Sequence, residues 1–306
     1  MKYNRLGKTD MHVSELALGC MSLGKDITHA RDIVQHAVKS GINFLDTADL
    51  YDFGLNEEMI GSIIKENRKD IILSTKVGNH FDTKSKDWYW DPSPAYIEEA
   101  VKDSLRRLQT DYIDLYMLHG GTIEDPIDEV IAAFEKLKKE GIIRAYGISS
   151  IRPNVIRQFV EKSTIDAVMM QYSLLDRRAE EEMLELLIAN QISVLARGTI
   201  AKGLLSNQAA ELIKKKASNG YLDYQFDELI EIHEKIISNP ELAQPLLALS
   251  QQYALKHKAI TSLVLGISST KQLLEALEHY NNANLTDEAY QFLQAITKAN
   301  KYLDHR

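Results

Sequence analysis

The 306-residue chain has little of what marks several classes of protein. Its single cysteine, Cys20, excludes a disulfide within the chain and favours a reducing compartment. It has no run of about 18 apolar residues long enough to cross a membrane, and its first residues lack the apolar core of a signal peptide. We therefore expect a cytoplasmic protein.

Basic residues are also in the minority. With 36 lysines and arginines against 44 aspartates and glutamates, the formal net charge is −8, so neither nucleic acid nor an anionic membrane is an expected partner. The nine histidines show neither H-x-H nor H-E-x-x-H spacing, and no metal site is expected. The G-x-G-x-x-G pattern is missing too, which argues against a doubly wound dinucleotide-binding sheet.

The chain does contain a regular alternation of short apolar runs with amphipathic segments. Runs such as residues 71–73 and 167–170 are apolar throughout, as expected of parallel strands covered on both faces. The segments between them show the i, i+3, i+4 spacing of helices. The predicted strands span residues 16–21, 43–48, 71–76, 112–119, 143–149, 167–172, 192–197 and 262–267. Eight strand–helix units in about 300 residues predict a (β/α)8 barrel, in one domain over residues 1–306.

Some segments interrupt this alternation. Residues 1–14 are expected to form a hairpin that closes the floor of the barrel, and residues 77–92 a long loop after the third strand. Residues 199–240 are expected to form an insertion after the seventh strand. A last helix is predicted over about residues 286–298, beginning at Thr286.

Four polar residues fall at the C-terminal ends of three successive predicted strands: Asp46 and Tyr51, Lys76, and His119. The active site of such a barrel lies at this end, and adjacent strands about 4.8 Å apart bring these side chains within hydrogen-bond reach. The pKa of a free phenol is about 10, and a nearby ammonium stabilises the phenolate, so we expect Lys76 to make the Tyr51 phenol acidic enough to protonate a carbonyl near neutral pH. A carboxylate can hold the lysine, and an imidazole can orient a carbonyl oxygen. Each residue alone could be structural, but the joint pattern indicates a site that gives a proton to a carbonyl.

With these residues in place, the sequence resembles the aldo-keto reductase superfamily, and most closely bacterial members of its potassium-channel β-subunit-like branch. The resemblance covers residues 4–276 and is carried by residues 41–51, 74–76, 118–119, 147–149, 172–177 and 202–205. It implies reduction of an aldehyde or ketone to an alcohol by hydride from NAD(P)H. It also implies that Tyr51 is the general acid, assisted by Lys76 with Asp46 beneath it, and that His119 positions the carbonyl.

The resemblance also implies how the nicotinamide would be bound. Ser149 and Ser150 stand where a Ser-Asn pair usually holds its carboxamide. Met169 occupies the position of the usual glutamine, and Gln171, on the same face of the strand, is the candidate substitute. The alternative is that Gln171 is a simple strand residue. Arg197 replaces the usual stacked aromatic residue, and a planar guanidinium can also stack.

At the other end of the cofactor, residues 198–203 are expected to follow the pyrophosphate, with Lys202 either a contact or a solvated loop charge. Ser268 and Ser269 stand where the family carries a basic residue for the 2′-phosphate, so the strongest charge-assisted contact is missing. NADP(H) is the expected cofactor and NAD(H) the alternative. The expected cofactor contacts are Gly19, Met21, Asp46, Ser149, Ser150, Gln171, Arg197, Gly198, Thr199, Lys202, Gly203, Gly266, Ser268, Gln272 and Glu275.

Both tryptophans of the chain, Trp88 and Trp90, lie in the loop after the third strand. They are expected either to form an apolar wall for the substrate or to pin the loop to the barrel rim. A small carbonyl compound is the expected partner. Two other functions are kept open: a cofactor-binding redox sensor with little turnover, and an aldolase that forms a Schiff base through Lys76.

Overall fold

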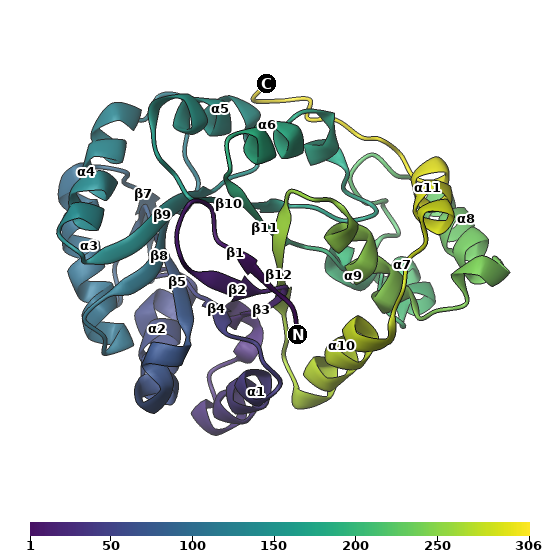
Figure 1. The fold of residues 1–306 in the computed structure, drawn as a ribbon, viewed down its shortest axis with the longest axis horizontal. Coiled ribbons are helices and arrows are strands. Elements are labelled where there is room, and N and C mark those ends of the chain that lie inside the picture. The colour runs from purple at the N-terminus through teal and green to yellow at the C-terminus, as the bar shows by residue number, and fades with distance from the viewer.

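Parallel strands close into a barrel, as the alternation of apolar runs predicts (Figure 1). The computed structural model describes residues 1–306. Around the barrel the order is β10 (Ala167–Gln171), β11 (Ser193–Arg197), β12 (Ile260–Gly266), β3 (Leu16–Gly19), β4 (Phe44–Asp46), β5 (Ile72–Val77), β8 (Ile113–Leu118) and β9 (Ile143–Ser149). Every predicted strand is present within a few residues of its expected bounds, and the predicted fold class is confirmed.

Helices that follow the barrel strands along the chain cover the outside of the barrel. They are α1 (Ile27–Lys39), α2 (Leu55–Ile64), α3 (Pro94–Leu108), α4 (Ile127–Lys139), α5 (Pro153–Lys162), α6 (Met183–Ala189), α9 (Leu246–Lys256) and α10 (Thr270–Asn282). Local signals set several of their starts. The Asp26 carboxylate accepts from two backbone N–H groups of the first turn of α1, and Ser93 caps α3 just before Pro94. The apolar stripes of these helices face the strands and form the larger core of the molecule.

A hairpin closes the floor of the barrel, as predicted for residues 1–14. Strands β1 (Tyr3–Arg5) and β2 (His12–Ser14) pair antiparallel, and Leu6 and Val13 join the apolar cluster inside the barrel. The backbone N–H of Gly7 donates to Ser193 Oγ at 2.8 Å, at the N-terminal end of β11. Gly7 has a φ of +53°, and a Cβ there would lie 2.4 Å from the carbonyl oxygen of Asp166, so this close approach requires glycine.

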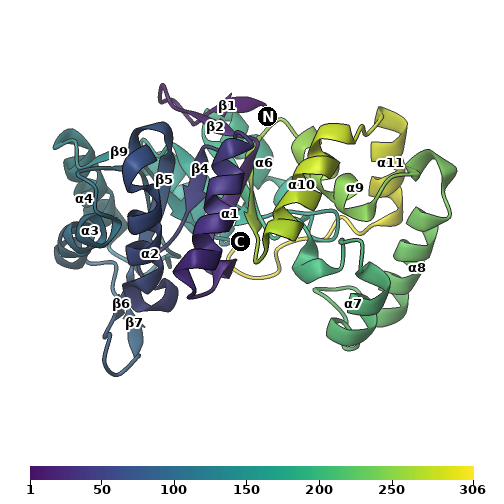
Figure 2. The same ribbon diagram turned by 90° about the horizontal axis from the view of Figure 1, so that it is seen from below.

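The segment 77–92 is not the simple loop we expected. It contains a second antiparallel hairpin, β6 (Asn79–Phe81) and β7 (Trp88–Trp90). Aromatic packing explains it, because the His80 ring stacks between Tyr89 and Tyr96, with centroids 4.7 and 4.3 Å away. Figure 2 shows β1–β2 and β6–β7 at opposite ends of the molecule, so the second hairpin rises from the C-terminal mouth of the barrel.

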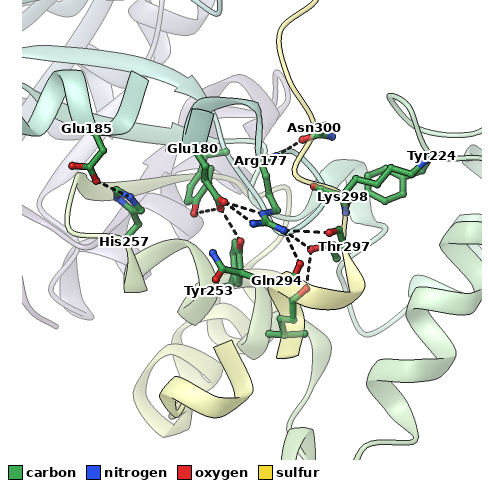
Figure 3. Close-up of polar contacts among 12 residues, drawn as sticks. Arg177, Glu180, Glu185, Tyr224, Tyr253, His257, Gln294, Thr297, Lys298 and Asn300 are labelled. Carbon is green, nitrogen blue, oxygen red and sulfur yellow. Dashed lines mark hydrogen bonds and ion pairs between the residues drawn. The ribbon is translucent and has the colours of Figure 1, made fainter. Parts of the chain in front are cut away.

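The insertion after β11 contains α7 (Ala209–Lys216) and α8 (Phe226–Ile237), and α8 contacts the last helix, α11 (Asp287–Ile296). Thr286 caps α11 as predicted, accepting from the Ala289 N–H at 3.1 Å. The helix ends at Ile296 rather than near residue 298. The reason is that Arg177 binds the carbonyl oxygens of Gln294 and Thr297, at 2.8 and 3.2 Å, and the chain turns away (Figure 3).

Arg177 also fastens the C-terminal tail, which we define as residues 297–306. Its backbone N–H donates to Asn300 Oδ1 at 2.8 Å, and its guanidinium pairs with Glu180 (Figure 3). From α11 the tail crosses to α5, where the Asn154 N–H donates to the His305 carbonyl at 2.9 Å (Figure 1). The tail therefore lies in a defined position over one side of the barrel. None of the helices combines the length and apolar character that a membrane span needs.

Candidate active site

Lys76 is the centre of the predicted polar group. Its ammonium donates to Asp46 Oδ2 and to the Thr47 carbonyl oxygen, both at 2.7 Å, and to the Tyr51 hydroxyl at 3.4 Å. Asp46 also accepts from Ser74 Oγ at 2.6 Å. The three strand-end residues thus form a hydrogen-bonded chain from carboxylate to ammonium to phenol at the mouth of the barrel.

The Lys76 side chain is 1% exposed, and burial disfavours its charged form. Asp46 and Tyr51 together outweigh burial, so the pKa of Lys76 is raised. The amine therefore stays an ammonium near neutral pH. A Schiff base needs the neutral amine as its nucleophile, so this environment disfavours the aldolase alternative.

Tyr51 opens a tight turn in which the next two residues, Asp52 and Phe53, both have positive φ. Its ring is largely buried, and burial raises the pKa of its hydroxyl more than Lys76 lowers it. We had expected the ammonium to leave the phenol acidified, and this expectation is wrong, because desolvation is the larger effect. The phenol consequently stays protonated near neutral pH, as a proton donor must.

His119 lies edge-on to Tyr51, with ring centroids 5.8 Å apart. Burial, with the charges of Lys76 and Arg197, lowers the pKa of His119 from 6.5 to about 3. The imidazole is therefore neutral at physiological pH, and its buried Nδ1 has no hydrogen-bond partner. A neutral imidazole can hydrogen-bond a carbonyl oxygen, but it carries no imidazolium proton to transfer.

Tyr51 and His119 face a cleft of about 730 Å³. Its other lining residues are Met21, Asn79, Trp88, Trp90, Gly120, Gly121, Thr122, Ser149, Ser150, Ile151, Arg152, Met169 and Arg197. Most residues expected at the nicotinamide end therefore meet here. Gln171 does not line the cleft, since its side-chain oxygen accepts from Arg178 at 3.2 Å, and Met169 lines it instead.

The two tryptophans have different environments. The Trp90 indole donates to Asp125 Oδ1 at 2.9 Å, and its ring covers Gly78 and Gly120, where an added Cβ would come 2.6 and 3.5 Å from it. Trp90 thus pins the β6–β7 hairpin to the barrel rim. Trp88 lines the same cleft but is 55% exposed, so its ring face is free to contact a substrate.

Residues expected at the adenosine end line a second cavity of about 340 Å³. Lys202, Gly203, Gly266, Gln272 and Glu275 contribute to its wall, together with Lys216 from α7. Ser268 lies outside the wall, because both its N–H and its hydroxyl donate to Gln272 Oε1 at 3.0 Å. The other expected contacts that line neither cavity are Gly19, Asp46, Gly198 and Thr199.

The two cavities fit an extended dinucleotide. The chain segment 197–203 contributes to both, with the Tyr51 phenol in the wall of one and Lys202 and Lys216 in the wall of the other. Arg197 and Ser149 line the cleft, and neither side chain forms a hydrogen bond or an ion pair with the protein. Polar groups left free in this way suit the amide and phosphates of a nicotinamide cofactor.

Sequence reasoning missed Arg152. Its guanidinium lines the cleft, and its Nη1 donates to the Gly121 carbonyl at 2.6 Å. The available signal was its position, since it follows Ser149 and Ser150 at the C-terminal end of a barrel strand.

Comparison with known proteins agrees with this geometry. The Aldo/keto reductase family model matches residues 15–298. The oxidoreductase YqkF of Bacillus subtilis is 53% identical over 313 residues, covering 100% of both chains. The NADH-specific methylglyoxal reductase of Escherichia coli is 30% identical, covering 98% of this chain and 99% of that protein. The holo form of aldo-keto reductase AKR11C1 from Bacillus halodurans superposes with a TM-score of 0.93 at 51% identity, over 100% of this chain and 99% of that one.

These matches span nearly the whole chain. They do not test the potassium-channel β-subunit-like branch within the family, which stays a prediction. The sensor and aldolase alternatives are not favoured by them. The chain therefore belongs to the aldo/keto reductase family, and it is an NAD(P)H-dependent oxidoreductase that reduces small carbonyl compounds.

Proposed function

We propose that Tyr51 is the general acid of this carbonyl reductase, supported by Lys76 and Asp46, and that His119 orients the substrate oxygen. The observation that carries this proposal is the hydrogen-bonded chain Asp46–Lys76–Tyr51, which ends at the cleft beside His119. When bound, the reduced nicotinamide supplies the hydride. The protein's own task is then to give the carbonyl oxygen a proton as charge develops on it.

The protonation states divide the roles between Tyr51 and His119. His119, with a pKa of about 3, is neutral and can only hydrogen-bond the oxygen. Tyr51 keeps its proton until the oxygen becomes basic, and the ammonium 3.4 Å away then stabilises the phenolate. Asp46 holds that ammonium in place and favours its charged form.

We propose that Ser149, Ser150 and Arg197 contact the nicotinamide end of the cofactor, and that Lys202 and Gln272 contact its phosphate and adenosine end. NADP(H) remains the first choice of cofactor, with Lys271 and serine hydroxyls in place of the family's basic residue. NAD(H) is the second choice, and two observations support it: Ser268 is bonded to Gln272, and the 30%-identical Escherichia coli relative is NADH-specific. We expect a small preference between the two.

The test follows oxidation of NADPH and of NADH by absorbance with a reactive aromatic aldehyde, in wild type and in Tyr51→Phe. Loss of the only phenolic proton in the cleft is expected to lower kcat by about 100-fold or more, with cofactor affinity retained. Tyr3→Phe is the matched control, because the Tyr3 hydroxyl lies at the barrel floor and donates to the Gly41 carbonyl. Wild-type turnover in Tyr51→Phe would refute the role of Tyr51. Turnover absent from wild type, with a borohydride-trapped adduct on Lys76, would instead support the aldolase.

A further inference from the structure

The charge of the cleft is opposite to that of the whole chain. The chain carries a formal net charge of −8, yet the cleft lining includes Arg152 and Arg197 and no aspartate or glutamate. The acids close to the cleft are occupied: Asp46 is paired with Lys76, and Asp125, in the loop after β8, accepts from Trp90 and Thr122. An anionic molecule entering the cleft therefore meets cations that no carboxylate of its wall neutralises.

Arg152 is held in place without being neutralised. Its Nη1 donates to the Gly121 carbonyl at 2.6 Å, and its backbone N–H donates to Ser150 Oγ at 3.2 Å. Arg177 and Arg178, which lie outside the cleft, differ from it, because Arg178 pairs with Asp176 and Arg177 with Glu180. Arg152 forms no ion pair, so its Nε and Nη2 are left free.

The position of Arg152 favours the substrate over the cofactor. Gly121, to which it is bonded, follows His119 by two residues, on the side of the cleft formed by the loop after β8. Arg197, which we assign to the cofactor, lies at the end of β11 instead. Arg152 also borders a further cavity of about 650 Å³. Its lining includes Tyr302, Leu303 and Asp304 of the C-terminal tail, together with Arg178 and Asp223. An extended substrate thus has room beyond the guanidinium.

We propose that Arg152 is a specificity residue that binds an anionic group, a carboxylate or a phosphate, carried by the substrate away from its carbonyl. This inference rests on the proposed function. A guanidinium presents a planar fork of N–H donors that matches either anion, and the bond to Gly121 limits the freedom lost on binding. The carbonyl would then lie at Tyr51 and His119 while its charged end reaches Arg152.

The test compares pairs of aldehydes in which one member carries an anionic group and the other is neutral. 4-Carboxybenzaldehyde and 4-nitrobenzaldehyde form one pair, and glyceraldehyde 3-phosphate and glyceraldehyde form the other, so the two pairs separate carboxylate from phosphate. In Arg152→Gln, the ratio of kcat/KM for the charged over the neutral member is expected to fall about tenfold or more in at least one pair, through KM. Arg152→Lys should recover part of the loss, since it restores the charge without the fork.

Arg5→Gln is the matched control. Arg5 also donates to loop carbonyls, those of Lys8 and Thr9, but at the barrel floor, so its removal should leave both ratios as in wild type. A second measurement needs no variant: in wild type, KM for the preferred anion should rise between about 0.05 and 0.5 M salt, and KM for its neutral partner should not.

The inference would be overturned if the ratios of kcat/KM were unchanged in Arg152→Gln, which includes an equal fall in kcat/KM for both members of each pair. Arg152 would then have only a structural role, holding the loop after β8 through Gly121. A change confined to the KM of NAD(P)H would overturn it too, and would assign Arg152 to the cofactor. If Arg152→Gln does not fold, the salt measurement on wild type still tests the inference. KM values for the anionic aldehydes that do not change with salt would then contradict it. Wild type that reduces none of the aldehydes would refute the proposed function, and with it this inference, whereas turnover with unchanged ratios refutes the inference alone.

Discussion

Lys76 and Asp46 form an ion pair 2.7 Å long in which both side chains are almost fully buried, at 1% and 4% exposed. Neither charge can regain water without the barrel opening. The pair therefore links the stability of the barrel to the proposed catalytic centre, because the ammonium bonded to Tyr51 is held by the Asp46 carboxylate.

Replacing Asp46 by asparagine is expected to lower the free energy of unfolding by about 3–5 kcal/mol, because Lys76 is left as an uncompensated buried charge. Urea denaturation measures this loss. Asp52→Asn is the control, since its ion pair with Lys25 is exposed and is expected to contribute at most about 1 kcal/mol. Equal losses in the two variants would show that Lys76 is not left as an uncompensated buried charge in Asp46→Asn.

The pKa of His119 predicts a pH dependence of stability. Its folded-state pKa of about 3 lies below its ordinary value of 6.5, so the unfolded chain takes up a proton at mildly acidic pH that the folded chain does not. The free energy of unfolding is therefore lost as pH falls from about 6.5 towards about 3, by on the order of 3 kcal/mol at pH 4 from this residue. Urea titrations from pH 7 to pH 4 should show a shallower decline in His119→Gln than in wild type. An equally steep decline in the free energy of unfolding of both proteins would contradict the burial of a neutral imidazole. His12→Gln is the control, because His12 is exposed on the floor hairpin.

Replacing Ser268 by arginine is expected to favour NADPH over NADH by about tenfold or more in kcat/KM, since a guanidinium adds the charge-assisted contact that the serine lacks. The same aldehyde is assayed with each cofactor. Ser238→Arg adds the same charge at the end of α8 and should leave the preference as it is. An unchanged preference in Ser268→Arg would mean that the 2′-phosphate lies elsewhere.

Replacing Arg177 by methionine is expected to lower the free energy of unfolding by about 3 kcal/mol, because Glu180 loses its cation and the carbonyls of Gln294 and Thr297 lose their donor. Hydrogen exchange should show the loss of protection concentrated in the C-terminal tail. Arg157→Met breaks an exposed pair with Glu182 and should cost at most about 1 kcal/mol. Protection retained in the tail of Arg177→Met would show that other contacts anchor it.

The barrel and the placement of the four polar residues follow from the sequence by itself. Apolar runs too short for helices, separated by amphipathic segments, can be buried on both faces only as parallel strands covered by helices. The carboxyl ends of parallel strands lie at the same rim of the barrel. The positions of Asp46, Lys76 and His119 at the ends of adjacent strands therefore predict that their side chains lie close together. Tyr51 follows Asp46 closely enough to share that position.

Only the tertiary structure decided how these groups behave and what surrounds them. The balance between burial and Lys76 at Tyr51 depends on how deeply the ring is covered, which no local pattern states. The different environments of Trp88 and Trp90 depend on Asp125 and on the glycines that Trp90 covers. The contacts of Arg152 with Gly121 and of Arg177 with Thr297 join residues 31 and 120 positions apart. Periodicity reports which elements form, because it reflects local geometry, but long-range contacts and desolvation arise only when those elements pack.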